Sequence, residues 1–143
     1  MQIINKKAKF NYRLLERIEA GISLIGAEAK ALRVSGADLS QSYAKIIGNE
    51  VYLINANIPV PGKKDYNPTR TRKLLLHRDE IISLRTKIKA KRLTLVPVRV
   101  YNKRRLVKVE LAIAKPKRKF EKKESIKKKD VEREIEIEAK SIY

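Results

Sequence analysis

SYAKIIGNEVYLI, at residues 42–54, carries the clearest folding signal in the sequence. Two runs rich in β-branched and aromatic residues, Ser42–Ile47 and Glu50–Ile54, flank the pair Gly48-Asn49. A two-residue loop with glycine first is typical of a type II′ turn, which joins two antiparallel strands. The stretch therefore predicts a β-hairpin.

Further strands are expected on both sides of this hairpin. Leu93–Tyr101 and Leu106–Ala114 are β-branched runs around a basic turn, and they predict a second hairpin. Pro97 lies inside the first of these runs, which indicates an edge strand or a bulge there. Phe10–Leu24 places aromatic and aliphatic residues at roughly alternate positions, so we expect a strand that is bent or broken at Gly21.

Two helices are expected between the strands. Residues 26–34 are rich in good helix formers, carry Glu28 in the first turn and end near Gly36, a typical C-cap residue. Leu74–Arg92 has apolar residues at helical spacing, acidic residues near its start and basic residues at its end, and it predicts the main helix. The proline-rich residues 59–68 predict a surface loop.

The fold class expected from this order is mainly β. Five or six strands and two helices are predicted, and hairpins dominate without a regular alternation of strand and helix. This order favours a small antiparallel barrel over a parallel sheet. OB-like barrels have this size and commonly bind RNA on a strand face and its loops. We therefore expect an OB-like barrel with flanking helices.

Charge is distributed unevenly along the 143 residues, which contain 35 Lys and Arg against 16 Asp and Glu. Residues 1–114 have a net charge of +15 and hold almost all aromatic and β-branched positions. Residues 115–129 have a net charge of +7, and residues 130–143 have −3. A highly charged segment with few apolar groups buries too little surface to offset the entropy of ordering. We expect an RNA-binding barrel at 1–114 and a basic C-terminal tail at 115–143 that is disordered when free.

The residue inventory excludes most catalytic chemistry. The chain has no cysteine and one histidine, His77, which rules out disulfides, thiolate zinc sites, cysteine nucleophiles and His-rich metal sites. Its five glycines lack the spacing of a phosphate-binding loop. We expect no enzyme, no cofactor and no metal. His77 is interpreted as a surface residue at a helix N-terminus in preference to a general base.

The net charge of +19 indicates a polyanionic partner. No run approaches the roughly 20 apolar residues that a spanning helix needs, and Met1–Lys7 lacks the apolar region of a signal peptide. We therefore expect a cytoplasmic, monomeric protein with no membrane partner. Nucleic acid is the expected ligand.

Aromatic residues lie among the basic blocks, at Phe10, Tyr43, Tyr66 and Phe120. RNA recognition joins phosphate neutralisation to base stacking, and no DNA recognition-helix motif is visible, so RNA is favoured over DNA. Tyr43 lies in a hairpin strand and fits a core position equally well. Two functions remain open on these residues: a dedicated RNA-binding factor, or a structural ribosomal or general RNA-chaperone protein.

Four segments, in the same order and spanning nearly the whole chain, give a specific resemblance. The most specific is Asn67–His77, which reads NPTRTRKLLLH. The other three are Asn5–Lys9 with Tyr12 and Glu19–Gly21, Gly26–Arg33, and Leu106–Lys115. On these residues the chain resembles the SmpB family, the SsrA-binding proteins.

The resemblance implies an OB-like barrel that binds the tRNA-like domain of tmRNA and delivers it to ribosomes stalled on messages without a stop codon, in trans-translation. It also implies which body residues contact or shape the RNA surface. These are Asn5, Lys6, Lys7, Glu19, Lys30, Arg33, Leu75 and His77. A carboxylate cannot neutralise phosphate, so Glu19 would accept a hydrogen bond from a base or a 2′-OH, or orient a lysine; a structural salt bridge is the alternative.

The resemblance also gives the tail a role, in which it enters the decoding centre of the small ribosomal subunit and the empty mRNA channel. Phe120 would stack on a base, and the cations would meet rRNA phosphates. The tail positions implied are Lys117, Arg118, Lys119, Phe120, Lys122, Lys123, Ile126 and Lys127. A purely electrostatic anchor is the alternative.

Overall fold

The computed structural model describes residues 1–118 and residue 122. Within these residues it contains seven strands and three helices. The strands are β1 (Gln2–Ile4), β2 (Tyr12–Ile22), β3 (Tyr43–Ile47), β4 (Glu50–Ile54), β5 (Arg72–Leu75), β6 (Thr94–Lys103) and β7 (Leu106–Pro116). The helices are α1 (Lys6–Asn11), α2 (Gly26–Ser35) and α3 (Arg78–Lys91).

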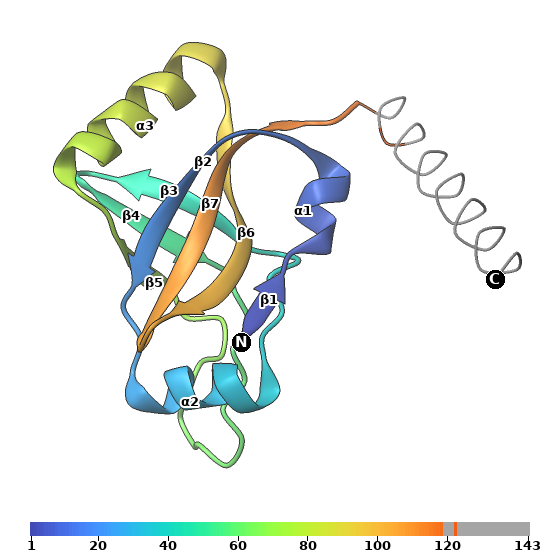
Figure 1. The fold of residues 1–143 in the computed structure, drawn as a ribbon, viewed down its shortest axis with the longest axis vertical. Helices are drawn as coiled ribbons and strands as arrows, with labels where there is room; N and C mark the ends of the chain where they lie inside the picture. Colours follow the sequence, from blue (N-terminus) through green and yellow to red (C-terminus); the bar gives the residue numbers. More distant parts are fainter. Residues whose placement is uncertain (119–121, 123–143) are drawn as a thin grey trace, which may run out of the picture.

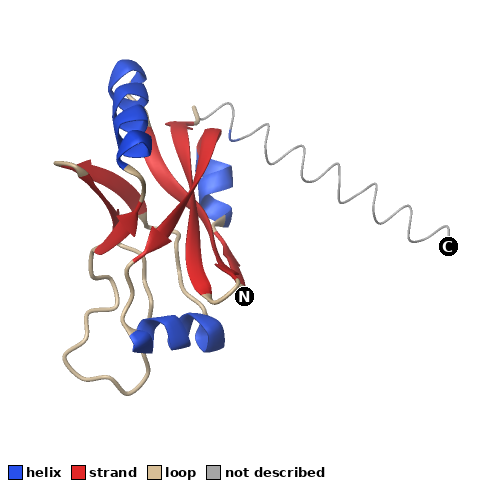
Figure 2. Cartoon of the chain, turned by 60° about the vertical axis from the view of Figure 1, so that its left-hand side comes forward, coloured by secondary structure: helices blue, strands red, loops and turns tan. Residues whose placement is uncertain are grey.

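All strands pair antiparallel, in the order β1-β6-β3-β4-β5-β2-β7. β6 also pairs with β7, so six strands close into a ring and β1 lies against β6. Figures 1 and 2 show α2 at one end of this ring and α3 near the other. The fold class is therefore mainly antiparallel β with short helices, as the sequence indicates.

The core fills the ring with aliphatic side chains from every strand except β1. Fully buried examples are Leu53, Leu74, Leu95 and Leu111. Leu53 and Leu74 alternate along their strands with more exposed residues, and Leu111 pairs with Pro97 beside the bulge in β6. Burying one such side chain contributes about 1.5–3 kcal/mol, so the ring is held mainly by its interior.

Both predicted hairpins are confirmed. β3 pairs with β4 around Gly48-Asn49, and of these two turn residues only Gly48 has a positive φ (62°), as a type II′ turn requires. β6 pairs with β7 around a two-residue turn in which Arg104 has a φ of 60°. The pairing skips a residue between Pro97 and Arg99, so the predicted bulge is also present.

The strand predicted at Phe10–Leu24 begins later and is not broken where expected. Phe10 lies in α1, because the Asn5 side chain accepts a hydrogen bond from the amide of Ala8 (3.2 Å) and starts that helix. Gly21 lies inside β2 and pairs with both β5 and β7. The irregularity of β2 is instead a register shift between Leu14 and Arg17.

The helix predicted at Leu74–Arg92 is correct only from Arg78 onward. Its first residues belong to β5, which pairs with β4 and β2. Four-residue strands give little sequence signal, and the same holds for β1 and the six-residue helix α1. For this reason the described structure has more strands and one more helix than predicted. The helix at 26–34 and the loop at 59–68 are confirmed.

Candidate nucleic-acid interface

Three of the predicted RNA-binding residues lie around one hollow on the surface. Glu19 comes from β2, Leu75 from β5, and His77 is the N-cap residue of α3. The hollow has a volume of about 520 Å³, and all three side chains are exposed. Its other lining residues are Gly21, Leu76, Glu80 and Lys108. The sheet thus brings together residues that are 58 positions apart in the chain.

Glu19 forms the salt bridge that the sequence analysis kept as an alternative. Its carboxylate accepts a hydrogen bond from the Tyr101 hydroxyl, and Lys103 Nζ lies 3.3 Å from Oε1. The Tyr101 hydrogen bond, aided by Lys103, holds the pKa of Glu19 below its usual value. Burial raises the pKa of Tyr101 to about 12, and the hydrogen bond to Glu19 adds to this shift. The carboxylate is therefore ionised and still exposed, so it can also accept a hydrogen bond from a ligand.

Gly21 keeps the floor of this hollow open. A Cβ added at Gly21 would lie 3.2 Å from Cβ of Leu75 and 3.4 Å from its Cδ1. Such a contact is tighter than ordinary packing, so a larger residue would push Leu75 outward. The glycine in this position allows β2 and β5 to approach closely.

Helix α2 presents the predicted pair Lys30 and Arg33, and both side chains are exposed. Arg33 Nη2 reaches the carbonyl oxygen of Arg105, in the turn between β6 and β7, at 3.5 Å. The last residue of β6, Lys103, pairs with Glu19 at the hollow. The surface of α2 is therefore connected to the hollow through the β6–β7 turn. We call the exposed side of α2 with Lys30 and Arg33, this turn and the hollow around Glu19, Leu75 and His77 together the α2 face.

The position of α2 is fixed by Glu28, whose side chain is fully buried. The Glu28 carboxylate pairs with the fully buried Arg72 of β5 (2.7 Å) and with Arg70, and it accepts a hydrogen bond from the Tyr66 hydroxyl (2.8 Å). The Ile25 amide, at the start of α2, donates to Glu28 Oε1 at 3.0 Å. These contacts attach α2 to β5 and to the loop at residues 56–71.

Arg72 completes the same network from the other side. Its guanidinium donates to the carbonyl oxygens of Ala56 (2.7 Å) and Pro68 (2.9 Å) and to the Tyr66 hydroxyl (3.0 Å). A buried ion pair is tolerated only when its remaining hydrogen-bonding groups are satisfied, and here they are. Burial raises the pKa of Glu28, but the hydrogen bonds from Arg70, Ile25, Tyr66 and Arg72 outweigh burial and lower it to about 2.

The remaining body residues are Lys6 and Lys7 in helix α1 and its N-cap residue Asn5, and none of them lines this hollow. Lys6 and Lys7 are exposed. Asn5 is buried, and its Nδ2 donates to the carbonyl oxygens of Leu39 (3.1 Å) and Pro97 (2.9 Å). Asn5 therefore shapes the surface by capping α1, and its side-chain amide is engaged by these backbone groups.

Three of the predicted tail residues are described. Lys117 is half-buried and donates from its amide to the Asn11 carbonyl oxygen at 2.9 Å, while Arg118 is exposed. The Lys122 amide donates to the Arg118 carbonyl oxygen at 3.2 Å. The other predicted tail residues lie outside the described part of the chain: Lys119, Phe120, Lys123, Ile126 and Lys127.

The aromatic residues expected at the RNA surface from the sequence divide into two kinds. Tyr43 is exposed, as one of its two interpretations predicted. Tyr66 and Arg72 instead form the internal network around Glu28. The alternation of buried and exposed residues along β5 would have identified Arg72 as inward-facing, had that strand been recognised. Tyr101, beside Glu19, carried no sequence signal of its own.

The described residues contain no helix that is long and apolar enough to cross a membrane. A closed ring of antiparallel strands in a chain with a net charge of +19 is typical of a β protein of the RNA-binding class. The family model for the SmpB protein matches residues 2–141, and the chain belongs to this family of non-enzymatic RNA-binding proteins. The resemblance based on the four sequence segments is confirmed.

Known relatives support the same assignment. The chain is 47% identical to an SsrA-binding protein of Malacoplasma penetrans over 135 residues, which are 92% of each chain. It is 48% identical to an SsrA-binding protein of Thermosipho africanus over 135 residues, 92% of this chain and 91% of the relative. A solved structure described as "tmRNA-SmpB: a journey to the center of the bacterial ribosome" has 40% identity and a TM-score of 0.68, covering 87% of this chain and 94% of its own.

Proposed function

We propose that this protein binds the tRNA-like domain of tmRNA and delivers it to stalled ribosomes in trans-translation, in the bacterial cytoplasm. The support is family membership over residues 2–141, together with relatives that are named for SsrA binding. We assign the ring of strands to the OB-like class, with residues 1–114 as the RNA-binding body and 115–143 as a tail. The observation that carries the site is the convergence of Glu19, Leu75 and His77 on one hollow.

The proposed tmRNA site is the α2 face. Lys30 and Arg33 neutralise phosphates there, and Arg33 extends that surface to the β6–β7 turn. Leu75 offers an apolar surface to a base or ribose, His77 offers an imidazole, and Glu19 accepts a hydrogen bond from a 2′-OH or a base edge. A carboxylate in this position also disfavours a bare phosphate, which gives the site selectivity for the sugar and base side of RNA.

The proposed role of the tail is contact with the ribosome, in the decoding centre and the empty mRNA channel. The support is its net charge of +7 over residues 115–129, which suits a channel lined by rRNA phosphates. Phe120 supplies the aromatic surface on which a base can stack. β7 ends at Pro116, so the tail leaves the body beside α1 and far from α2 (Figure 1). One molecule can therefore contact tmRNA and the ribosome at once.

If the α2 face is the tmRNA site, removing the cations of α2 should strongly lower the affinity for the tRNA-like domain. The Lys30→Ala/Arg33→Ala double variant is expected to bind the tRNA-like domain of tmRNA at least about tenfold more weakly, since two phosphate contacts are lost. The salt dependence of binding should also become shallower by about two in log–log slope. Fluorescence anisotropy with labelled tRNA-like domain, between 50 and 300 mM salt as a rough range, measures both.

The control is Lys45→Ala/Lys89→Ala, which removes the same charge from β3 and α3. This variant is expected to bind the tRNA-like domain within about threefold of the unmodified protein, because long-range electrostatic effects are screened beyond roughly 10 Å. If both double variants lose the same affinity for the tRNA-like domain, net charge alone drives binding. Unchanged affinity after the Lys30 and Arg33 substitutions would remove α2 from the site.

A further inference from the structure

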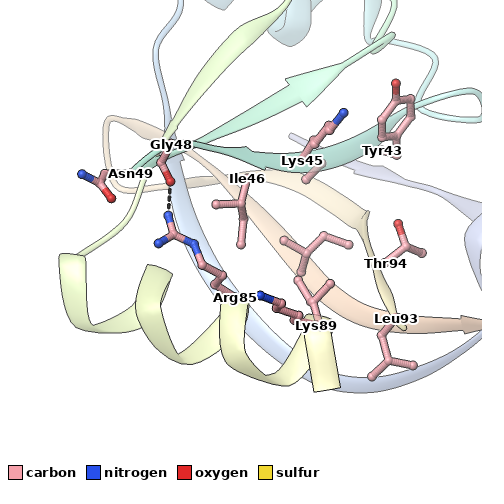
Figure 3. Close-up of a pocket in the computed structure, with 12 residues that line it drawn as sticks. Tyr43, Lys45, Ile46, Gly48, Asn49, Arg85, Lys89, Leu93 and Thr94 are labelled. Carbon is pink, nitrogen blue, oxygen red and sulfur yellow. Dashed lines mark hydrogen bonds between the residues drawn. The ribbon is translucent and has the colours of Figure 1, made fainter. Parts of the chain in front are cut away.

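A hollow among the described residues lies between β3, the second half of α3 and the start of β6. Its volume is about 810 Å³ (Figure 3). Aliphatic side chains form its floor, namely Ile46, Ile88, Leu93 and Leu95. Lys45, Arg85 and Lys89 surround that floor with positive charge. This hollow shares no residue with the one around Glu19.

A second hollow of about 410 Å³ continues the first one toward α1. The two share Tyr43 and Thr94, so they form one continuous surface, which we call the α3–β3 groove. Lys7 lines its far part, together with the amide and hydroxyl side chains of residues 40–42. The groove therefore has cations at both ends and an aromatic ring between them.

All charged side chains that line the α3–β3 groove are positive. No Asp or Glu lines either hollow, whereas Glu19 and Glu80 both line the hollow of the α2 face. Lys45 and Lys89 form no ion pair with any residue of the described chain. Unpaired cations above an apolar floor favour an anionic ligand that also carries flat, apolar groups.

Two residues are arranged for such a ligand. Arg85 donates a hydrogen bond to the carbonyl oxygen of Gly48, which fixes its guanidinium at one end of the groove (Figure 3). Tyr43 is 39% exposed at the junction of the two hollows. An exposed tyrosine flanked by cations is the arrangement with which proteins stack unpaired bases while neutralising the adjoining phosphates.

We propose that the α3–β3 groove is a second RNA site, which takes a short unpaired strand. One base stacks on Tyr43, Lys45 and Lys89 neutralise the neighbouring phosphates, and the polar side chains beside Tyr43 hydrogen-bond to ribose hydroxyls. The site deepens the proposed function, because it gives the body a surface for RNA other than the tRNA-like domain. The part of the groove around Tyr43, Lys45 and Lys89 shares no lining residue with the hollow around Glu19, and the second site is assigned to this part. The part beside α1 includes Asn5 and Lys7, which the resemblance assigns to tmRNA.

The test uses the full chain and an eight-nucleotide oligouridylate, which has no stable secondary structure. Tyr43→Ala is expected to weaken binding about five- to 150-fold, the range for loss of one stacked base, while Tyr43→Phe keeps the ring and should bind as the unmodified protein does. Lys45→Ala/Lys89→Ala is expected to weaken binding at least about tenfold. The charge-matched variant Lys30→Ala/Arg33→Ala should stay within about threefold.

NMR chemical shifts locate the ligand independently of the tail. With oligouridylate, the amides of Tyr43, Lys45 and Thr94 are expected to shift, while those of Leu75 and His77 stay in place. Equal losses of affinity for oligouridylate in the two double variants, or an unchanged affinity in Tyr43→Ala, would overturn the proposal. Shifts caused by a peptide of sequence 130–143, and not by oligouridylate, would assign the groove to that acidic segment and also overturn it.

The proposed function and the proposed second site can be refuted independently of each other. A protein that binds the tRNA-like domain but leaves the groove resonances unchanged with oligouridylate refutes the second site alone. A protein that binds oligouridylate in the groove but does not prefer the tRNA-like domain over an unrelated structured RNA refutes the proposed function alone.

Discussion

Replacing Glu28 by alanine is expected to lower the free energy of unfolding by about 3–5 kcal/mol, because the guanidinium of Arg72 would remain buried without its counter-ion. Glu28 and Arg72 are both fully buried, and their carboxylate–guanidinium separation is 2.7 Å. Such a loss is a large fraction of the stability of a domain of this size. Urea denaturation followed by circular dichroism measures the change.

Glu80→Ala is the matched control for this experiment. Glu80 is also a carboxylate in the first turn of a helix, and it accepts a hydrogen bond from the His77 amide at 2.9 Å, but on the exposed surface. Its removal should cost no more than about 1 kcal/mol. If Glu28→Ala does not fold, Glu28→Gln keeps the shape and still removes the charge. A loss below about 1 kcal/mol for both Glu28 variants would show that the ion cluster is not important for stability.

The pH dependence of stability gives a second measurement of the same carboxylate. The pKa of Glu28 is about 2 in the folded protein and near 4.5 when unfolded. A folded-state pKa below the unfolded one means that Glu28 stabilises the protein fully above pH 4.5. This contribution is lost as the pH falls from 4.5 toward 2, and the shift corresponds to about 3 kcal/mol. In Glu28→Gln the stability should change much less over this range; an equally steep fall would assign the acid sensitivity to other carboxylates.

This ion cluster also has a functional consequence. Through Glu28 it fixes α2, which presents Lys30 and Arg33. Through Arg72 it fixes β5, which presents Leu75 to the hollow three residues later. Both halves of the α2 face therefore take their positions from one buried network. Charged groups in the core of a small domain are costly, and here they hold in place the two elements that carry the proposed binding residues.

The sequence allowed prediction of the parts of the fold that depend on local chemistry. The β3–β4 hairpin follows from a glycine at the one turn position that needs a positive φ, and the end of α2 follows from Gly36 with a φ of 78°. The bulge beside Pro97 follows from the missing amide proton of proline. Each of these is decided by one or two neighbouring residues.

The parts that were missed depend on contacts between distant segments. α1 exists because Asn5 caps it and is itself held by the carbonyl oxygens of Leu39 and Pro97, up to 92 positions away. β5 is defined by its pairing with β4 and β2, and Arg72 reads as a surface cation until Glu28 is brought beside it. A pattern in one segment contains no information about its partner.

The two proposed RNA surfaces differ in how far the sequence indicates them. The residues of the α2 face came from the resemblance, because neither Glu19 nor Leu75 has a distinctive local pattern. The α3–β3 groove was not predicted, since Lys45 and Lys89 are 44 positions apart and meet only because α3 packs beside β3. Tyr43, for which core and surface were both open, is decided by its exposure at that junction.

Truncation after Arg118 is expected to abolish tagging on stalled ribosomes while leaving the affinity for the tRNA-like domain within about threefold of the full chain. Cutting there keeps β7, which ends at Pro116, and the hydrogen bond from the Lys117 amide to Asn11, so the body loses none of these contacts. Helix α2, which carries Lys30 and Arg33, lies at the other end of the molecule, as Figure 1 shows. Binding by anisotropy and peptide tagging in a reconstituted translation system measure the two effects separately.

Two further variants of the full chain distinguish the possible roles of the tail. Phe120→Ala removes one aromatic ring and no charge, and tagging should fall at least about tenfold if base stacking positions the tail. Replacing Lys122, Lys123 and Lys127 by glutamine removes three charges and keeps Phe120, which tests the electrostatic anchor. If only the glutamine variant loses tagging activity, the tail is an electrostatic anchor without a specific stacking contact. If the truncated protein still supports tagging, the body alone carries out ribosome rescue and the proposed role of the tail is wrong.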